Sequence, residues 1–260
     1  MLVEWANYLT LPAPRDHRRL GYVRESVSLL SRSRRCRRAW EPHLAAARAM
    51  IADAFADLPR RRTVLVLGSG LLDDVPLAAL AAAFETVLLV DAVHPWPTRR
   101  AVRPYPNVRL LSADLSGSAD WLLGRAADLH DPLPGLVADR PVDLVVSANL
   151  LSQLPILPLA WFEERGRAVP EGLGSRIVTA HLAGLARIPA RTCLVADVAQ
   201  VEEDRGGTIV ERIDLLHGVR LAAPDRRWDW ELAPFGEAER HTRLVHRVQA
   251  YRDWRPAERG

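Results

Sequence analysis

The segment from residue 64 to residue 76 reads Val64-Leu65-Val66-Leu67-Gly68-Ser69-Gly70-Leu71-Leu72-Asp73-Asp74-Val75-Pro76. An apolar run bounded by turn residues is typical of a strand that is covered on both faces. Glycine is needed where the backbone takes a positive φ or where a ligand approaches the main chain closely. Asp73 and Asp74 are typical of helix-capping residues, and Pro76 fits the first turn of the helix. The segment therefore predicts a strand, a turn and a helix, with backbone amides of the turn facing a bound ligand.

The same alternation of apolar runs and helical segments continues along the chain. Five short apolar runs predict buried parallel strands at 63–67, 86–90, 107–111, 142–146 and 192–195. Helical spacing of apolar residues is found at 75–84, 121–129, 157–169 and 173–188. Two later segments, 228–232 and 241–251, instead alternate apolar and polar residues, with Pro234, Phe235 and Gly236 in their connection. We therefore expect a doubly wound α/β sheet built from right-handed βαβ units, with an antiparallel hairpin at its edge.

The first 62 residues differ from the rest of the chain in pattern and charge. Apolar residues recur at three- and four-residue spacing from Asp16 to Leu58, which predicts two helices with a break near Pro42. We expect residues 1–62 to form a helical extension that acts as a lid, and residues 63–260 to form a Rossmann-like domain. The extension contains a basic cluster, made of Arg32, Arg34, Arg35, Arg37 and Arg38.

The basic cluster has two interpretations. Its arginines are spread around the helix, which favours a solvated or ion-paired surface. Guanidinium groups also bind carboxylate and phosphate well, so capture of an anionic substrate stays open. Binding of nucleic acid is less favoured, because aromatic side chains that could stack on bases are sparse nearby.

Two carboxylates follow the second and third predicted strands. Asp91 comes about twenty residues after the glycine turn, where an acid can accept hydrogen bonds from both hydroxyls of a ribose. Asp114, followed by Leu115, comes where an adenine amino group would lie. Asp91 could instead cap a helix, and Asp114 could be a plain turn aspartate. Because parallel strands end at one edge of a sheet, we expect the glycine turn and both acids to surround one crevice.

On these residues the chain resembles the class I S-adenosylmethionine-dependent methyltransferases, over about residues 63–251. The resemblance implies a mostly parallel, seven-stranded sheet with a reversed final strand, and S-adenosylmethionine as the cofactor. It implies that the glycine turn lies against the methionine part of the cofactor, that Asp91 holds the ribose and that Asp114 binds the adenine. Segment 142–151 is similar to the family's fourth motif, whose end borders the methyl-transfer site. The cofactor-binding residues implied are Gly68, Ser69, Gly70, Asp91, Asp114, Leu115 and Asn149.

Two positions depart from the family's usual pattern. Val66 stands where the family usually has an acid, and Leu72 stands where it usually has a third glycine. These departures favour an alternative, a catalytically inactive protein of the same fold that binds or regulates. A nicotinamide-dependent oxidoreductase is a third option, but the missing third glycine and the reversed hairpin argue against it.

The residues that follow the fourth strand offer amides and no evident general base, so no catalytic residue is assigned. Displacement at a sulfonium methyl group depends mainly on alignment, which makes a base dispensable for many acceptors.

Histidines and cysteines add few candidate sites. His181 shares a helical face with apolar residues and is expected to pack in the core, whereas His43 could lie at a helix start near the pocket. His94 is expected in an exposed loop, or else beside the adenine. Cys193 fits the core, and Cys36 among arginines could have a lowered thiol pKa. The cysteine spacing does not fit a zinc site, so no metal is expected.

The composition, with 48% hydrophobic and 26% charged residues, is typical of a packed globular protein. Charged residues or prolines interrupt every apolar run, so we expect no membrane span, and the N-terminal segment lacks the charge order of a secretory signal. We therefore expect a cytoplasmic protein. A formal net charge of +3 is too small to indicate nucleic acid. The sequence thus predicts methyl transfer from S-adenosylmethionine to a small-molecule acceptor, with an anionic acceptor as one option.

Overall fold

The structure is a computed structural model that describes residues 5, 8–138 and 140–256. Its strands are β1 (Thr63–Leu67), β2 (Thr86–Asp91), β3 (Val108–Ser112), β4 (Val142–Ala148), β5 (Arg191–Asp204), β6 (Ile209–Asp214), β7 (Arg226–Ala233) and β8 (Thr242–Tyr251). Its helices are α2 (Arg15–Arg19), α3 (Tyr22–Arg35), α4 (Arg37–Ala56), α5 (Leu77–Ala83), α6 (Trp96–Ala101), α7 (Ala119–Leu122), α8 (Leu133–Val137), α9 (Ile156–Glu163) and α10 (Leu173–Arg187).

One mixed sheet forms the centre of the described chain. Its strands follow the order β3-β2-β1-β4-β5-β8-β7, and β6 pairs with β5 outside this path. The five strands β1 to β5 run parallel, and β1 lies between β2 and β4. All five predicted parallel strands are therefore confirmed. Since Leu67 pairs with both Val90 and Ser147, the C-terminal ends of β1, β2 and β4 lie at the same edge of the sheet.

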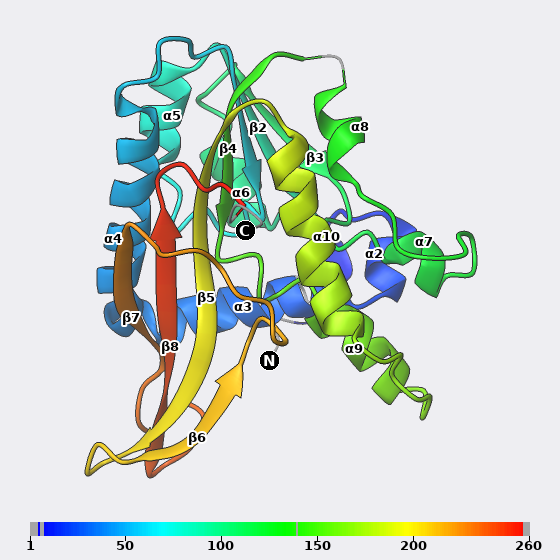
Figure 1. Cartoon of the computed structure of the whole chain (residues 1–260), viewed down its shortest axis with the longest axis vertical. Coiled ribbons are helices and arrows are strands. Elements are labelled where there is room, and N and C mark those ends of the chain that lie inside the picture. Colours follow the sequence, from blue (N-terminus) through cyan, green and yellow to red (C-terminus); the bar gives the residue numbers. More distant parts are fainter. Residues whose placement is uncertain (1–4, 6–7, 139, 257–260) are drawn as a thin grey trace.

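Alternate side chains of the buried strands pack into two separate cores. Val64 and Val66 of β1 point into a core shared with α4 and α5, whereas Leu65 and Leu67 point into a core shared with α10. Figure 1 shows α4 and α5 on one side of the sheet and α10 on the other. Both faces of β1 are thus covered, which explains why its five residues are all buried and all but Thr63 are apolar.

The C-terminal part of the sheet carries the expected reversed strand. β8 pairs antiparallel with both β5 and β7, so it lies between them. Residues 234–236 fall in the β7–β8 connection, as predicted. This strand order confirms the doubly wound, mostly parallel fold of the class I methyltransferase type that the sequence predicts.

The sequence missed the eighth strand and the length of β5. β5 runs from Arg191 to Asp204, well beyond the predicted segment 192–195, and its second half alternates between buried and partly exposed residues. Every residue of β6 is exposed, so this strand has no buried face to mark it in the sequence. Figure 1 shows β6 and the ends of β5 and β8 extending away from the body of the molecule.

The break between the two long N-terminal helices lies at Cys36, and the predicted break near Pro42 is wrong. Cys36 donates its amide to Arg32 and accepts a hydrogen bond from the amide of Trp40, so one helix ends where the next begins. Pro42 lies inside α4, where it removes one backbone donor. The buried residues of α4, which include Trp40 and Met50, compensate by packing on the sheet.

Three other predictions need correction. The segment 121–129 is helical only at its start, because α7 ends at Leu122, and α9 ends at Glu163 and not near residue 169. Cys36 is buried, and burial raises the pKa of its thiol, so the hypothesis of a lowered pKa is wrong. Cys193 is fully buried as expected, and burial raises its pKa to about 12. None of the described helices is long and apolar enough to cross a membrane.

Candidate functional site

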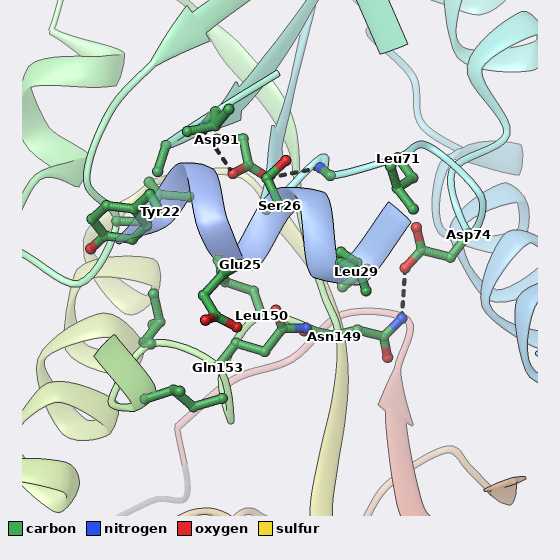
Figure 2. A pocket seen from close by; sticks show the side chains of 18 of the residues that line it. Tyr22, Glu25, Ser26, Leu29, Leu71, Asp74, Asp91, Asn149, Leu150 and Gln153 are labelled. Carbon is green, nitrogen blue, oxygen red and sulfur yellow. Dashed lines mark hydrogen bonds between the residues drawn. The ribbon is translucent and has the colours of Figure 1, made fainter. Parts of the chain in front are cut away.

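One cavity lies at the C-terminal ends of β1 to β4, underneath α3. Of the seven residues proposed from sequence, six line it: Gly68, Gly70, Asp91, Asp114, Leu115 and Asn149. Ser69 does not line it, because its side chain is fully buried behind the turn. Figure 2 shows α3 crossing the cavity, with Tyr22 near one end of the helix and Asp74 beyond the other. The structure therefore brings together residues that are far apart in the sequence.

The glycine turn is shaped by two positive φ angles and one close contact. Gly68 has a φ of 73° and Gly70 a φ of 45°, a region that side chains disfavour. A Cβ atom at Gly68 would lie 3.0 Å from the Leu150 side chain. Leu72, which occupies the position of the usual third glycine, also takes a left-handed φ of 64°. Glycine at 68 is thus required both by backbone conformation and by the approach of the β4 end.

Asp91 faces the glycine turn. Its Oδ2 accepts a hydrogen bond of 2.7 Å from the amide of Gly70, and its Oδ1 accepts a weaker one of 3.4 Å from the amide of Val93. Burial raises the pKa of this carboxyl group. Because the next helix, α6, begins only at Trp96 with Pro95 as its N-cap, Asp91 does not cap a helix. Its carboxylate instead forms part of the cavity wall.

Asp114 organises the loop that precedes α7. Its Oδ1 accepts hydrogen bonds from the amide and hydroxyl of Ser116 and from the hydroxyl of Tyr22 at 2.6 Å. Its Oδ2 accepts from the amides of Ser118 and Ala119. The turn-aspartate interpretation therefore describes what Asp114 does here, although it also lines the cavity. An adenine amino group would have to share or replace one of these donors, and Tyr22 is the one contributed by α3.

We expect Tyr22→Phe to loosen α3 over the cavity. The change removes a part-buried hydrogen bond to a carboxylate, and such an interaction contributes about 1.5 to 3 kcal/mol. Hydrogen exchange of the α3 amides should therefore become about tenfold faster. Tyr105→Phe removes a hydroxyl outside the cavity and serves as the control. Equal α3 exchange in the two variants would show that Tyr22 does not hold the helix.

Asn149, which is buried, and Asp74, which is half-buried, form a pair beside the glycine turn. Asn149 has a φ of 52°, and its Nδ2 donates a hydrogen bond of 2.6 Å to Oδ2 of Asp74. Its Oδ1 is buried and has no partner among the described residues. Burial raises the pKa of Asp74 to about 6.

The capping role predicted for Asp73 and Asp74 is wrong. The N-cap of α5 is Pro76, without a side-chain hydrogen bond. Asp73 instead accepts a hydrogen bond from Ser33, and Asp74 accepts the one from Asn149. Their place in the sequence, just before a helix, gave no signal that both side chains reach the cavity wall.

Aromatic side chains from α4 and β7 form another part of the cavity wall. The rings of His43 and Trp230 are stacked, with centroids 4.1 Å apart and planes 8° from parallel. Trp40 packs edge-on against Trp230 at 5.2 Å. Burial lowers the pKa of His43 to about 4. The sequence offered His43 as a possible pocket residue, but it gave no signal for Trp40 and Trp230, which meet only through tertiary packing.

Two other histidines lie outside the cavity. His94 is 1% exposed and its Nε2 lies 2.9 Å from the carbonyl oxygen of Leu111, so the exposed-loop prediction is wrong. His181 is buried as predicted, with its Nε2 3.1 Å from the hydroxyl of Ser147. Burial lowers the pKa of His181 to about 4.

The charges around the cavity are acidic. Five carboxyl groups line it, from Glu25, Asp73, Asp74, Asp91 and Asp114, and no arginine does so in the described part of the chain. The basic cluster of the N-terminal extension lies elsewhere. Arg35 forms an ion pair with Glu237 at 2.7 Å, and Arg34 and Arg37 line a neighbouring hollow that shares Asp73 with this cavity. None of the five arginines of the cluster lines this cavity.

The fold and the cavity together define a class I methyltransferase architecture, with the cavity where the βα turns of such a sheet converge. No protein family model and no curated protein sequence matches the chain. Similar solved structures include 1,6-didemethyltoxoflavin-N1-methyltransferase from Burkholderia thailandensis, with bound 1,6-didemethyltoxoflavin and S-adenosylhomocysteine. It is 17% identical, the alignment covers 93% of this chain and 92% of that chain, and the TM-score is 0.42.

Two further similar structures are also methyltransferases. The N-methyltransferase NodS from Bradyrhizobium japonicum, in complex with S-adenosylhomocysteine, is 12% identical, with 79% of this chain and 85% of that chain covered and a TM-score of 0.37. A SAM-dependent methyltransferase from Leishmania major is 12% identical, with 95% of this chain and 82% of that chain covered and a TM-score of 0.39.

Proposed function

We propose that this protein transfers a methyl group from S-adenosylmethionine to a small-molecule acceptor. The observation that carries the proposal is the meeting of the Gly70 amide and the Asp91 carboxylate on one cavity wall, with Asn149 of the β4 end on the same cavity. Sequence order and sheet order thus agree in placing a glycine turn and a strand-end acid around one crevice.

The residues present fit this cofactor. The glycine turn allows close approach of the methionine part, and Asp91 is placed to accept hydrogen bonds from ribose hydroxyls. Asp114 and Leu115 line the side of the cavity assigned to the adenine. The unpartnered Oδ1 of Asn149 and the neighbouring Asp74 carboxylate supply acceptors for the ammonium group of the amino-acid end. Five carboxyl groups also favour a ligand that carries positive charge at its sulfonium centre.

The bound cofactor supplies an electrophilic sulfonium methyl group, and the protein's contribution is alignment and exclusion of water. α3 covers the cavity with Tyr22, Glu25, Ser26 and Leu29. We therefore extend the proposal to α3, within the N-terminal extension of residues 1–62, as the lid of the domain formed by residues 63–260; residues 1–4 and 6–7 of the extension lie outside the described residues. His43 is a weak general base here, because burial lowers its pKa to about 4, so an acceptor that needs no deprotonation by this histidine suits the site.

Titration calorimetry with S-adenosylmethionine and S-adenosylhomocysteine tests the proposal. We expect binding in the micromolar range for both. If neither ligand gives binding heat at millimolar concentration, both the proposed cofactor and the proposed enzyme activity are wrong. Binding of both ligands without turnover of any acceptor would instead favour the catalytically inactive alternative, which the departures at Val66 and Leu72 motivate.

The raised pKa of Asp74 predicts a pH-dependent affinity for the cofactor. Its carboxyl group is ionised above about pH 6 and neutral below it, so attraction for a cationic ligand weakens as the pH falls. Between pH 7.5 and pH 5 we expect affinity for S-adenosylmethionine to fall about fivefold. Asp74→Asn should bind weakly at both pH values and show a flatter dependence.

The same titration affects stability with a defined sign. Because the folded-state pKa of about 6 lies above the ordinary value of 3.8, the folded protein binds more protons between these values. The free energy of unfolding contributed by Asp74 therefore rises as the pH falls through this window, and Asp74→Asn removes that contribution. A steeper pH dependence of affinity in Asp74→Asn than in the wild type would contradict this assignment.

A further inference from the structure

The aromatic wall, formed by Trp40, His43 and Trp230, belongs to the opposite half of the sheet from the acids assigned to the adenosine. Asp91 and Asp114 follow β2 and β3, whereas Trp230 lies on β7 at the other end of the strand order. Asn149, at the end of β4, lies between these two halves. If the adenosine occupies the β2–β3 side, the part of the cavity beyond Asn149, which the aromatic wall lines, is left for an acceptor. The wall is therefore placed to contact the acceptor and not the cofactor.

The hydrogen bond between His43 and Trp228 fixes which nitrogen of His43 carries the proton. An indole N–H can only donate, and Nε1 of Trp228 lies 3.0 Å from Nδ1 of His43. Nδ1 is therefore the acceptor, and the proton of the neutral ring must be on Nε2. Burial keeps the ring neutral at physiological pH, because it lowers the pKa of His43 to about 4. His43 thus presents an N–H donor and does not act as a base through Nε2.

That donor is unsatisfied. Nε2 of His43 is buried and has no hydrogen-bond partner among the described residues, and the same holds for Nε1 of the stacked Trp230. His43 is 1% exposed and Trp230 is 6% exposed, yet both line the cavity. Leaving a buried N–H without an acceptor is unfavourable. A ligand that brings an acceptor atom to this wall would give the Nε2 proton of His43 the hydrogen-bond partner that it lacks.

The charge of the cavity then limits what that ligand can be. Five carboxyl groups line the cavity, and the described residues place no arginine in its wall to offset them. An acceptor oxygen that belonged to a carboxylate or phosphate would be repelled by these acids. A carbonyl oxygen or a ring nitrogen accepts a hydrogen bond without carrying a full charge. Flat aromatic walls favour a planar ligand, because stacked or edge-on contacts with rings add to the burial of apolar area.

We propose that the methyl acceptor is an uncharged planar ring bearing a carbonyl oxygen or ring nitrogen, which accepts a hydrogen bond from Nε2 of His43 against the aromatic wall. This inference rests on the proposed function in one respect, namely that the ring bound at the aromatic wall is the methyl acceptor. Binding of the ring does not itself require the cofactor. It replaces the anionic acceptor that the basic cluster left open, since that cluster lies outside the cavity. His43 is in this view a residue that determines specificity.

A matched pair of probes separates the alternatives. 1-Naphthamide and 1-naphthoate share one ring system, and they differ in that the first is neutral and the second anionic. Their binding is measured by NMR on the full chain, with and without saturating S-adenosylhomocysteine, following the Nε2 proton of His43. We expect a proton to be present on Nε2 of His43 at pH 7. We expect 1-naphthamide to bind at least about tenfold more tightly than 1-naphthoate, and to change the chemical shift of this proton. Equal or tighter binding of 1-naphthoate, or a proton on Nδ1 of His43, would overturn the proposal.

Variants of His43 complete the test. His43→Phe keeps a flat ring and removes the Nε2 donor together with the Nδ1 acceptor of Trp228, so affinity for 1-naphthamide should fall about tenfold, as expected for one buried hydrogen bond. His43→Gln restores a donor and should recover part of the loss. His181→Phe, at a second buried histidine outside the cavity, is the control and should leave probe affinity unchanged, with folding of each variant checked by thermal unfolding.

The two proposals fail in different ways. His43→Phe should leave the affinity for S-adenosylhomocysteine within about twofold of the wild type. If S-adenosylhomocysteine does not bind but 1-naphthamide does, the proposed cofactor fails and the ring site stands. If His43→Phe leaves 1-naphthamide affinity unchanged, His43 does not contact the ring and the present proposal is wrong, whatever the cofactor does.

Discussion

Asp91→Ala should lower the affinity for S-adenosylhomocysteine about 100-fold. The change removes a half-buried carboxylate that accepts the Gly70 amide at 2.7 Å and lines the cavity where the ribose is assigned. Hydrogen bonds to a charged acceptor contribute about 1.5 to 3 kcal/mol each, and about 2.7 kcal/mol corresponds to 100-fold in affinity. The loss of affinity is measured by titration calorimetry at pH 7.5, where the carboxyl group of Asp74 is ionised.

Two further variants show whether the carboxylate itself is responsible. Asp91→Asn keeps an oxygen that can accept from the Gly70 amide, so we expect a smaller loss of about tenfold. Asp128→Asn changes an exposed carboxylate that pairs with Arg176, and it should leave affinity unchanged. Unaltered binding in Asp91→Ala, with an unfolding transition like that of the wild type, would exclude the ribose assignment.

The parallel half of the sheet could be predicted because its strands are buried on both faces. β1, β2 and β4 consist largely of Val and Leu and are bounded by turns, so composition and length both indicate strands. β6 could not be predicted in the same way, because all six of its residues are exposed. The helix break was misplaced for a related reason: proline usually ends a helix, but burial of one face of α4 outweighs the single missing backbone donor at Pro42.

The candidate site was predictable only where its residues follow strand ends. Asp91 and Asn149 come directly after β2 and β4, so the topology of the sheet brings them to one edge. Tyr22 and Trp230 reach the cavity from elements whose place depends on tertiary packing, and 92 residues separate Tyr22 from its partner Asp114. Asp74 was assigned to a helix cap because its local sequence fits one, although its side chain pairs with Asn149, 75 residues away.

The two departures from the family pattern have different structural consequences. Val66 is buried in the core shared with α4 and α5, opposite Leu89 and Val146, so an acid at this position would meet an apolar surface. Acidic groups reach the cavity from the turn itself instead, through Asp73 and Asp74. Leu72 adopts the left-handed conformation without being glycine, so the turn keeps its shape at some cost in strain. The turn at Gly68 is consequently the more sensitive position.

Gly68→Ala should both destabilise the protein and weaken cofactor binding. The left-handed φ of 73° disfavours a side chain by about 1 to 2 kcal/mol. The added Cβ would also lie 3.0 Å from the side chain of Leu150, so the turn or the β4 end must shift, at a further cost of about 1 to 2 kcal/mol. We expect the free energy of unfolding to fall by about 2 to 4 kcal/mol in urea, and affinity for S-adenosylhomocysteine to fall tenfold or more, since small displacements of positioning groups have large effects.

Gly207→Ala separates the two causes. Gly207 has a φ of 82°, and a Cβ there would have no heavy atom within 4 Å, so this variant carries the backbone penalty alone, in a turn of the β5–β6 hairpin remote from the cavity. It should lose about 1 to 2 kcal/mol of stability and keep its full affinity for S-adenosylhomocysteine. If Gly68→Ala matched Gly207→Ala in both measurements, the Leu150 side chain would move away from the added methyl group without cost. Cofactor binding would then not depend on the close contact between the turn at Gly68 and Leu150.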